Sequence, residues 1–186
     1  LCNILKNETI KKEVRERIET IEPCIGEPSP KGSVKELLMQ ENAETLSRIL
    51  IEGVEMVKDN LTKFLSKDWY SLRTMHNFLF TRDASMSINN EVLIGGMDNS
   101  IRDRESVIMQ SIFDFTPEFK TKTLKVNPVP GATKRIRTSE GGDVLVARED
   151  VLLIGNGART STQAIDMLIY EYINRKSEKP QHIIVQ

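Results

Sequence analysis

Two acidic residues, Asp83 and Glu140, stand at matching places in two segments of the sequence. Asp83 ends the triplet Thr-Arg-Asp, and Glu140 begins Glu-Gly-Gly-Asp; each precedes a short predicted β-hairpin. An arginine follows each acid by 19 residues, Arg102 after Asp83 (102 − 83) and Arg159 after Glu140 (159 − 140). The sequence therefore predicts an internal repeat in which each copy carries one carboxylate and one guanidinium. We expect Asp83 to end a strand beneath a pocket.

This pattern suits the binding of a guanidinium compound. Two carboxylates that face one pocket repel each other unless a cation lies between them. A planar guanidinium fills that place well, because its N–H groups pair bidentately with carboxylates. Two arginines at the rim would suit a carboxylate at the other end of the ligand. A small molecule with both groups is arginine.

A purely structural interpretation of the same residues stays open at this point. Asp83 could form an ion pair with Arg82 or Arg102, and Glu140 could cap the turn before Gly141 and Gly142. Structural ion pairs are common, and they also shift the pKa values of acids. The spacing alone does not separate the two interpretations.

The elements that would position these residues follow from the apolar pattern after residue 78. Apolar residues at 86–88 and 92–94 flank Asn89-Asn90, which favours a tight hairpin turn. A helix at 105–113 and a strand at 123–126 follow. The order recurs as a strand at 143–147, a turn at 148–150, a strand at 151–155, a helix capped by Thr160 or Ser161 and running to about Arg175, and a strand at 182–186. The sequence thus predicts two ββαβ units.

Residues 1–75 are predicted to be a separate, helical domain. Apolar residues recur at helical spacing between many charges. We expect core positions at Ile10, Val14, Ile18, Ile21, Leu38, Leu46, Ile49, Leu50, Val54, Val57, Leu61, Phe64 and Leu65. Gly26, Pro28, Pro30 and Gly32 separate two helical zones. Ser33, with Glu36 three residues later, is typical of a capping box. A small antiparallel bundle or a helical arm is the expected result.

The composition excludes several classes of protein. The chain of 186 residues has 39% hydrophobic and 28% charged residues and a net charge of −1, which is typical of a soluble globular protein. The basic run KRIR at 134–137 is too short to indicate a nucleic-acid binder. No apolar stretch has membrane-spanning length, and no secretory signal pattern is present. We expect a cytoplasmic protein with no nucleic acid or membrane partner.

The two cysteines indicate neither a disulfide framework nor a metal site. Cys2 and Cys24 have no histidine at ligand spacing. We therefore expect no metal and no cofactor.

Four segments together resemble one enzyme family. These are NFLFTRD, IRDRE, SEGGDVLV and IGNGARTSTQAID. They are similar to arginine deiminase, a member of the guanidino-group-modifying superfamily with the five-bladed α/β propeller called the pentein fold. The resemblance covers most of the chain. It implies an α/β fold with about two ββαβ blades of an incomplete propeller at 76–186 and an α-helical insert domain at 1–75.

The resemblance also implies a reaction and roles for individual residues. The family hydrolyses L-arginine to L-citrulline and ammonia through a covalent intermediate on a cysteine, with a histidine that transfers protons. The resemblance assigns the guanidinium of the substrate to Asp83 and Glu140, its carboxylate to Arg102 and Arg159, and the lining of the pocket to Asn77 and Phe80.

The sequence departs from the family in its catalytic groups. The family has a His-x-Asp motif after the strand that resembles QHIIVQ, and its cysteine lies near the C-terminus; this chain ends at Gln186 before either. Cys2, Cys24, His76 and His182 do not occupy those contexts. We therefore expect no turnover by this chain alone, and association into a homo-oligomer through strands and apolar faces that lack neighbours.

Two other functions remain open. One is a different guanidino-modifying enzyme, such as an agmatine deiminase, a dimethylarginine hydrolase or an amidinotransferase. The helical insert and the arginine pair count against these, because agmatine has no carboxylate. The other is a truncated, non-catalytic module that serves in assembly.

Overall fold

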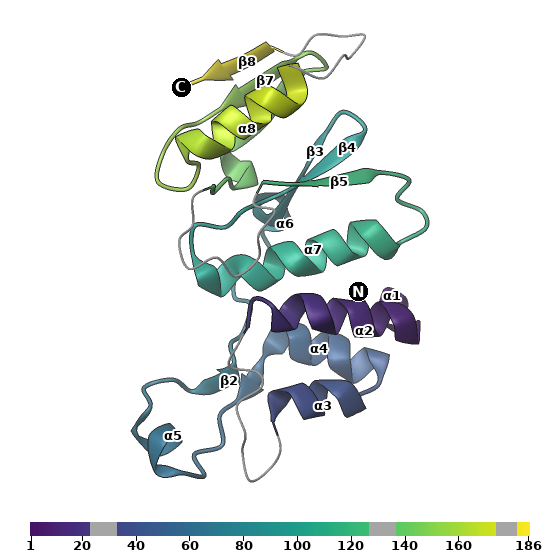
Figure 1. Ribbon diagram of the computed structural model, residues 1–186, viewed down its shortest axis with the longest axis vertical. Helices are drawn as coiled ribbons and strands as arrows, with labels where there is room; N and C mark the ends of the chain where they lie inside the picture. The colour runs from purple at the N-terminus through teal and green to yellow at the C-terminus, as the bar shows by residue number, and fades with distance from the viewer. Residues whose placement is uncertain (23–32, 127–136, 174–181) are drawn as a thin grey trace. The chain divides into compact units, whose positions relative to one another are not determined.

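The chain folds into two compact units, Leu1–Phe78 and Leu79–Gln186. In this computed structural model, residues 1–22, 33–126, 137–173 and 182–186 are described (Figure 1). The glycines and prolines at 26–32, Cys24, most of the basic run at 134–137, and Arg175 lie outside these ranges. The division falls three residues after the predicted domain boundary at residue 75 (78 − 75).

The first unit is built mainly of helices, as its apolar spacing predicts. They are α1 (Cys2–Leu5), α2 (Glu8–Glu19), α3 (Val34–Gln40) and α4 (Ala43–Glu52). Asn7 and Asn42 cap α2 and α4 with their side chains, and the predicted capping box of Ser33 and Glu36 is confirmed at the start of α3. Buried Leu5, Val14, Ile18, Leu46 and Leu50 form its apolar interior.

The prediction of a helix across residues 54–65 is wrong. Helix α4 ends at Glu52, because Gly53 takes a φ of 84°, a left-handed conformation that ends the helix. The chain then forms β1 (Val54–Glu55), which pairs antiparallel with β2 (Tyr70–Leu72), and between them the short α5 (Leu61–Leu65). Three expected core residues are exposed on it: Leu61 by 73%, Phe64 by 68% and Leu65 by 69%.

The second unit contains the two predicted ββαβ repeats. The first is β3 (Ser85–Ile88), β4 (Glu91–Ile94), α7 (Asp103–Phe115) and β5 (Lys122–Lys125); the second is β6 (Val144–Arg148), β7 (Val151–Ile154), α8 (Thr162–Ile173) and β8 (His182–Val185). Each repeat forms a three-stranded sheet in the order of its strands, with an antiparallel hairpin and a parallel last strand. The predicted turn at Asn89-Asn90 is confirmed, with Asn89 at a φ of 54°.

The two repeats share one apolar core. Met86, Ile88 and Leu93 of the first repeat belong to the same buried cluster as Val144, Leu152, Ile154 and Leu168 of the second. Backbone hydrogen bonds also cross between the repeats, since Gly96 and Ser139 exchange N–H···O bonds of 3.1 and 2.8 Å. The relative position of the two repeats is therefore fixed by packing and by backbone pairing.

The local structure at Asp83 differs from the predicted strand. Residues Thr81–Ala84 form one helical turn, α6, and the strand β3 begins only at Ser85. The Asp83 N–H donates to the Phe80 carbonyl at 3.0 Å, and the Ser85 hydroxyl donates to the Thr81 carbonyl at 3.1 Å. These short-range bonds stabilise a turn that an apolar-run pattern does not reveal.

All helices in the described part of the chain are too short or too polar to cross a lipid bilayer.

Gly141 begins the short 3₁₀ helix η3 (Gly141–Asp143), where the two repeats approach closely. A Cβ at this position would collide with the Arg82 carbonyl oxygen, which belongs to the backbone and cannot move alone. We predict that Gly141→Ala lowers the free energy of unfolding by about 1–3 kcal/mol, measured by urea denaturation of the whole chain. Gly157→Ala is the control: a Cβ there meets nothing within 4 Å, and a change below about 0.5 kcal/mol is expected. Equal effects of the two substitutions would contradict this account.

Candidate functional site

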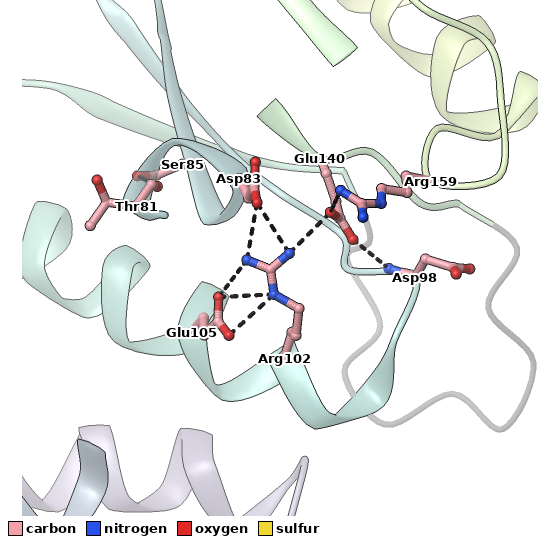
Figure 2. Close-up of polar contacts among 8 residues, drawn as sticks. All are labelled: Thr81, Asp83, Ser85, Asp98, Arg102, Glu105, Glu140 and Arg159. Carbon is pink, nitrogen blue, oxygen red and sulfur yellow. Dashed lines mark hydrogen bonds and ion pairs between the residues drawn. The ribbon is translucent and has the colours of Figure 1, made fainter. Parts of the chain in front are cut away.

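Asp83 and Glu140 converge on one guanidinium, that of Arg102 (Figure 2). Asp83 Oδ2 accepts hydrogen bonds from Arg102 Nη1 and Nη2, both at 3.1 Å. Glu140 Oε2 accepts from the same Nη1 at 3.1 Å. The two acids, 57 residues apart in sequence (140 − 83), thus share one nitrogen atom as hydrogen-bond donor. Their side chains are only 18% and 4% exposed.

Glu105 is a third carboxylate of this cluster. It accepts two bonds of 3.2 Å from Arg102 Nε and one of 2.8 Å from Nη2, and its side chain is 2% exposed. In the sequence, Glu105 is the last residue of the segment IRDRE, and no separate role is predicted for it. The spacing of three residues at a helix start could have indicated the pair, because residues three apart on a helix lie on one face.

The three carboxylates keep Arg102 charged. Burial by itself would lower the pKa of Arg102, but the hydrogen bond and charge of Glu105, the hydrogen bond of Asp83 and the charge of Glu140 outweigh it, and the pKa is raised above its ordinary value. A guanidinium in these surroundings stays protonated at every pH at which the protein is folded.

Contacts between the repeats hold the two acids in place. Arg82 reaches from α6 to η3 and β6, donating from Nε to the Gly141 carbonyl at 3.0 Å and from Nη2 to the Val144 carbonyl at 2.8 Å. The Asp98 N–H donates to Glu140 Oε1 at 3.4 Å. Arg82 therefore links the backbone beside Asp83 to the backbone beside Glu140. Its guanidinium donates these hydrogen bonds to carbonyl groups and not to the two acids.

Arg102 and Arg159 both stand just before a helix, as predicted, but their surroundings differ. Arg102 ends the 3₁₀ helix η2 (Ser100–Arg102) and is 10% exposed at its side chain. Arg159 lies before α8 and is 67% exposed, with Nη1 at 3.6 Å from Glu140 Oε2. The next residue is held firmly, since Thr160 donates to Asp143 Oδ2 at 2.7 Å. Arg159 thus has a fixed backbone and an exposed guanidinium.

Helix α8 begins after Ser161, one of the two predicted caps. Its hydroxyl oxygen accepts from the Ala164 N–H at 3.3 Å and from the Thr138 N–H at 3.0 Å.

The remaining predicted site residues lie as follows. Phe80 precedes α6 in the second unit and is 53% exposed. Asn77 belongs to the first unit, and its side chain is exposed. Neither residue belongs to the hydrogen-bonded cluster around Arg102.

The cysteine and the histidines of the described residues belong to other elements of the chain. Cys2 is half-buried in α1 of the first unit, and residues 79–186 contain no cysteine. His76 is exposed in the first unit, with Nε2 at 2.6 Å from the Thr74 hydroxyl. His182 is exposed on β8.

These features define the class of the protein: an α/β chain of ββαβ repeats in which acids from both repeats converge on a guanidinium. The sequence profile of one family, arginine deiminase, matches residues 3–186. The chain therefore belongs to the arginine deiminase family.

Individual relatives agree with this assignment. The chain is 29% identical over 160 residues to an arginine deiminase of Listeria monocytogenes, covering 82% of this chain and 38% of the relative. It is 28% identical over 186 residues to one of Streptococcus agalactiae, covering 91% and 43%. An arginine deiminase of Borrelia garinii is 33% identical over 114 residues, covering 60% and 26%. The chain thus spans at most 43% of the length of these curated relatives.

Solved structures of another enzyme are also similar. A dimethylarginine dimethylaminohydrolase adduct with S-methyl-L-thiocitrulline is 20% identical, with a TM-score of 0.44 over 59% of this chain and 39% of that one. The enzyme from Pseudomonas aeruginosa complexed with citrulline is 20% identical, with a TM-score of 0.43 over 59% and 38%.

The buried ion pair between Arg102 and Glu105 supports the stability of the second unit. We predict that Glu105→Gln lowers the free energy of unfolding by about 1.5–3 kcal/mol, because it weakens buried, charge-assisted hydrogen bonds while Asp83 and Glu140 still neutralise Arg102. The control is Glu52→Gln. Glu52 makes a similar bidentate contact with Arg48, but both side chains are more than 60% exposed, so no measurable change is expected. Urea denaturation that showed similar losses for both variants would contradict this prediction.

Proposed function

We propose that the complete protein to which this chain belongs hydrolyses L-arginine to L-citrulline and ammonia. The convergence of Asp83 and Glu140 on a guanidinium is the observation that carries this proposal. Membership of the arginine deiminase family supports it. The Arg102 side chain carries the same planar cation as free arginine, so the contacts that it makes are those that a substrate guanidinium would need.

The site is rich in carboxylates. Asp83, Glu105 and Glu140 each lie within ion-pair distance of a guanidinium, and their side chains are at most 18% exposed. Carboxylates shielded from water favour a cation close by, which supports the binding of a guanidinium ligand.

The proposed roles divide the site into two ends. Asp83 and Glu140 hold the substrate guanidinium and orient its central carbon atom. Arg102 and Arg159 bind the substrate carboxylate, and the exposure of Arg159 supports this. Phe80, which is exposed just before α6 in the same unit, is proposed to line the pocket. A ligand held at both ends keeps its reacting carbon at a fixed place, which lowers the entropic part of the barrier.

The chemical step needs two groups besides these residues. In the family reaction a cysteine thiolate attacks the guanidinium carbon, a C–N bond breaks, and the amidino group stays on sulfur until water releases citrulline. Ammonia leaves only after a general acid has protonated the nitrogen. Asp83 and Glu140 would stabilise the cationic substrate and hold it in line for this attack. We propose that the thiol and the imidazole come from outside residues 79–186.

We further propose that the two ββαβ repeats are neighbouring blades of a pentein propeller with a helical insert, in a cytoplasmic homo-oligomer. Exposed apolar residues on the outer strands of the second repeat support its contact with a neighbouring blade or subunit. They are Leu145 and Val146 on β6 and Ile184 and Val185 on β8, each at least 38% exposed.

The carboxylate pair can be tested by neutral, isosteric substitutions in the full-length product of the gene. We predict that Asp83→Asn and Glu140→Gln each lower kcat/KM for citrulline formation from L-arginine by about 10- to 100-fold, since each removes charge-assisted hydrogen bonds. Asp150→Asn is the matched control, because the Asp150 carboxylate lies outside the cluster around Arg102 and accepts hydrogen bonds from the exposed Arg148. Folding of each variant is checked by circular dichroism.

Unchanged turnover in folded Asp83→Asn and Glu140→Gln would show that the carboxylates are structural. No citrulline from the wild-type product would overturn the proposed reaction itself.

The 186-residue chain alone is predicted to form no citrulline, because neither of its cysteines, Cys2 and Cys24, occupies the sequence context of the family's nucleophile. A colorimetric citrulline assay beside the full-length product tests this. Citrulline formation by the 186-residue chain would show that a different nucleophile serves the reaction.

A further inference from the structure

We infer that Arg102 is a specificity-determining residue that acts as an internal competitor for the guanidinium site. It occupies the place between Asp83 and Glu140, so that ligands with a guanidinium but no carboxylate are excluded. This inference rests on the proposed function, and it adds a role for Arg102 beyond contact with the substrate carboxylate.

The two acids are already occupied by a cation. Arg102 Nη1 donates to Asp83 Oδ2 and to Glu140 Oε2, each at 3.1 Å, and Nη2 donates to the same Asp83 oxygen at 3.1 Å. Two guanidinium groups cannot both lie between these two oxygen atoms. A ligand guanidinium that takes the place of Arg102 between Asp83 Oδ2 and Glu140 Oε2 must therefore break three hydrogen bonds of Arg102.

Arg102 does not have to leave the site when those bonds break. Glu105 holds a different edge of its guanidinium, through Nε and Nη2, and does so from the first turn of α7. Figure 2 shows Glu105 on one side of the Arg102 guanidinium and Glu140 on the other, with Asp83 above. Since the Glu105 side chain is 2% exposed, this contact is well shielded from water. We expect Arg102 to turn about Glu105 while its Nη1 is released.

The released Nη1 needs a new acceptor. A buried donor of a charged group is costly when it is left without one. The carboxylate of L-arginine can supply that acceptor. The carboxylate end of the ligand then replaces a hydrogen bond of Arg102 that the guanidinium end has displaced. Agmatine has the same guanidinium but an ammonium-bearing end, which cannot accept a hydrogen bond and repels Arg102. Arg102 therefore disfavours agmatine through competition as well as through charge.

Substitution of Arg102 should affect the two ligands in opposite directions, because it removes a contact with the carboxylate of L-arginine and a competitor of agmatine. We predict that Arg102→Gln lowers kcat/KM for L-arginine by about tenfold or more, because the carboxylate contact is lost. The same variant should bind agmatine about tenfold or more tightly than wild type does, because the competitor has been removed. The measurements are citrulline formation from L-arginine and titration calorimetry with agmatine, both on the full-length product of the gene.

Two controls separate this effect from a general gain of negative charge. Butane-1,4-diamine carries two charges like agmatine but no guanidinium, and its affinity should rise much less in Arg102→Gln. Arg159→Gln also removes a guanidinium near Glu140, but one at 3.6 Å that is 67% exposed. It should lower turnover of L-arginine without a comparable gain in agmatine binding.

The outcomes distinguish this inference from the proposed function. If wild-type protein forms citrulline but folded Arg102→Gln binds agmatine no more tightly, the competition is absent and the inference is wrong, while the function stands. An equal gain for the diamine would overturn it in the same way. If wild-type protein forms no citrulline, the proposed function fails, and this inference with it.

A second variant covers the case in which Arg102→Gln does not fold, since it leaves three acids without their shared cation. Arg102→Lys keeps the charge but cannot contact Asp83, Glu105 and Glu140 together with a planar fork. It should also bind agmatine more tightly than wild type, by a smaller factor. Unchanged or weaker agmatine binding in folded Arg102→Lys would overturn the inference.

Discussion

The second unit depends on one buried guanidinium and the three carboxylates around it. Asp83, Glu105 and Glu140 have side chains between 2% and 18% exposed, and acids so far from water need a cation close by. Arg102, the last residue of η2, supplies it to all three. Because the acids come from α6, α7 and the residue before η3, this single side chain joins elements from both repeats.

Other contacts allow that cluster to form. The shared apolar core and the Gly96–Ser139 backbone bridge set the distance between the repeats, and Arg82 fastens the backbone beside one acid to the backbone beside the other. Hydrophobic burial is non-directional, so it could not alone bring two carboxylate oxygens to one nitrogen atom. The directional hydrogen bonds of Arg82 and the bridge provide that alignment.

Under the proposed function, stability and recognition would use the same chemistry in this site. The pair of acids that a guanidinium neutralises in the free protein would also select a guanidinium from solution. In the proposed arginine-hydrolysing enzyme, the same acids would serve both needs in turn. The structural interpretation of the Asp83–Arg102 pair and the binding interpretation are thus compatible, since they describe one site without and with its ligand.

The sequence by itself determined the repeat: two hairpins, each followed by a helix and a further strand, with Asp83 and Glu140 before the hairpins and Arg102 and Arg159 before the helices. It also determined the capping box at Ser33 and the membership of the arginine deiminase family. These features are encoded by neighbouring residues, through periodicity, turn chemistry and caps. Only the tertiary structure decided which cation neutralises the acids, the part played by Glu105, the helical turn at Asp83 and the exposure of Leu61, Phe64 and Leu65. Those features depend on groups distant in the chain, and the apolar spacing that predicts a helix does not say whether any other element covers its face.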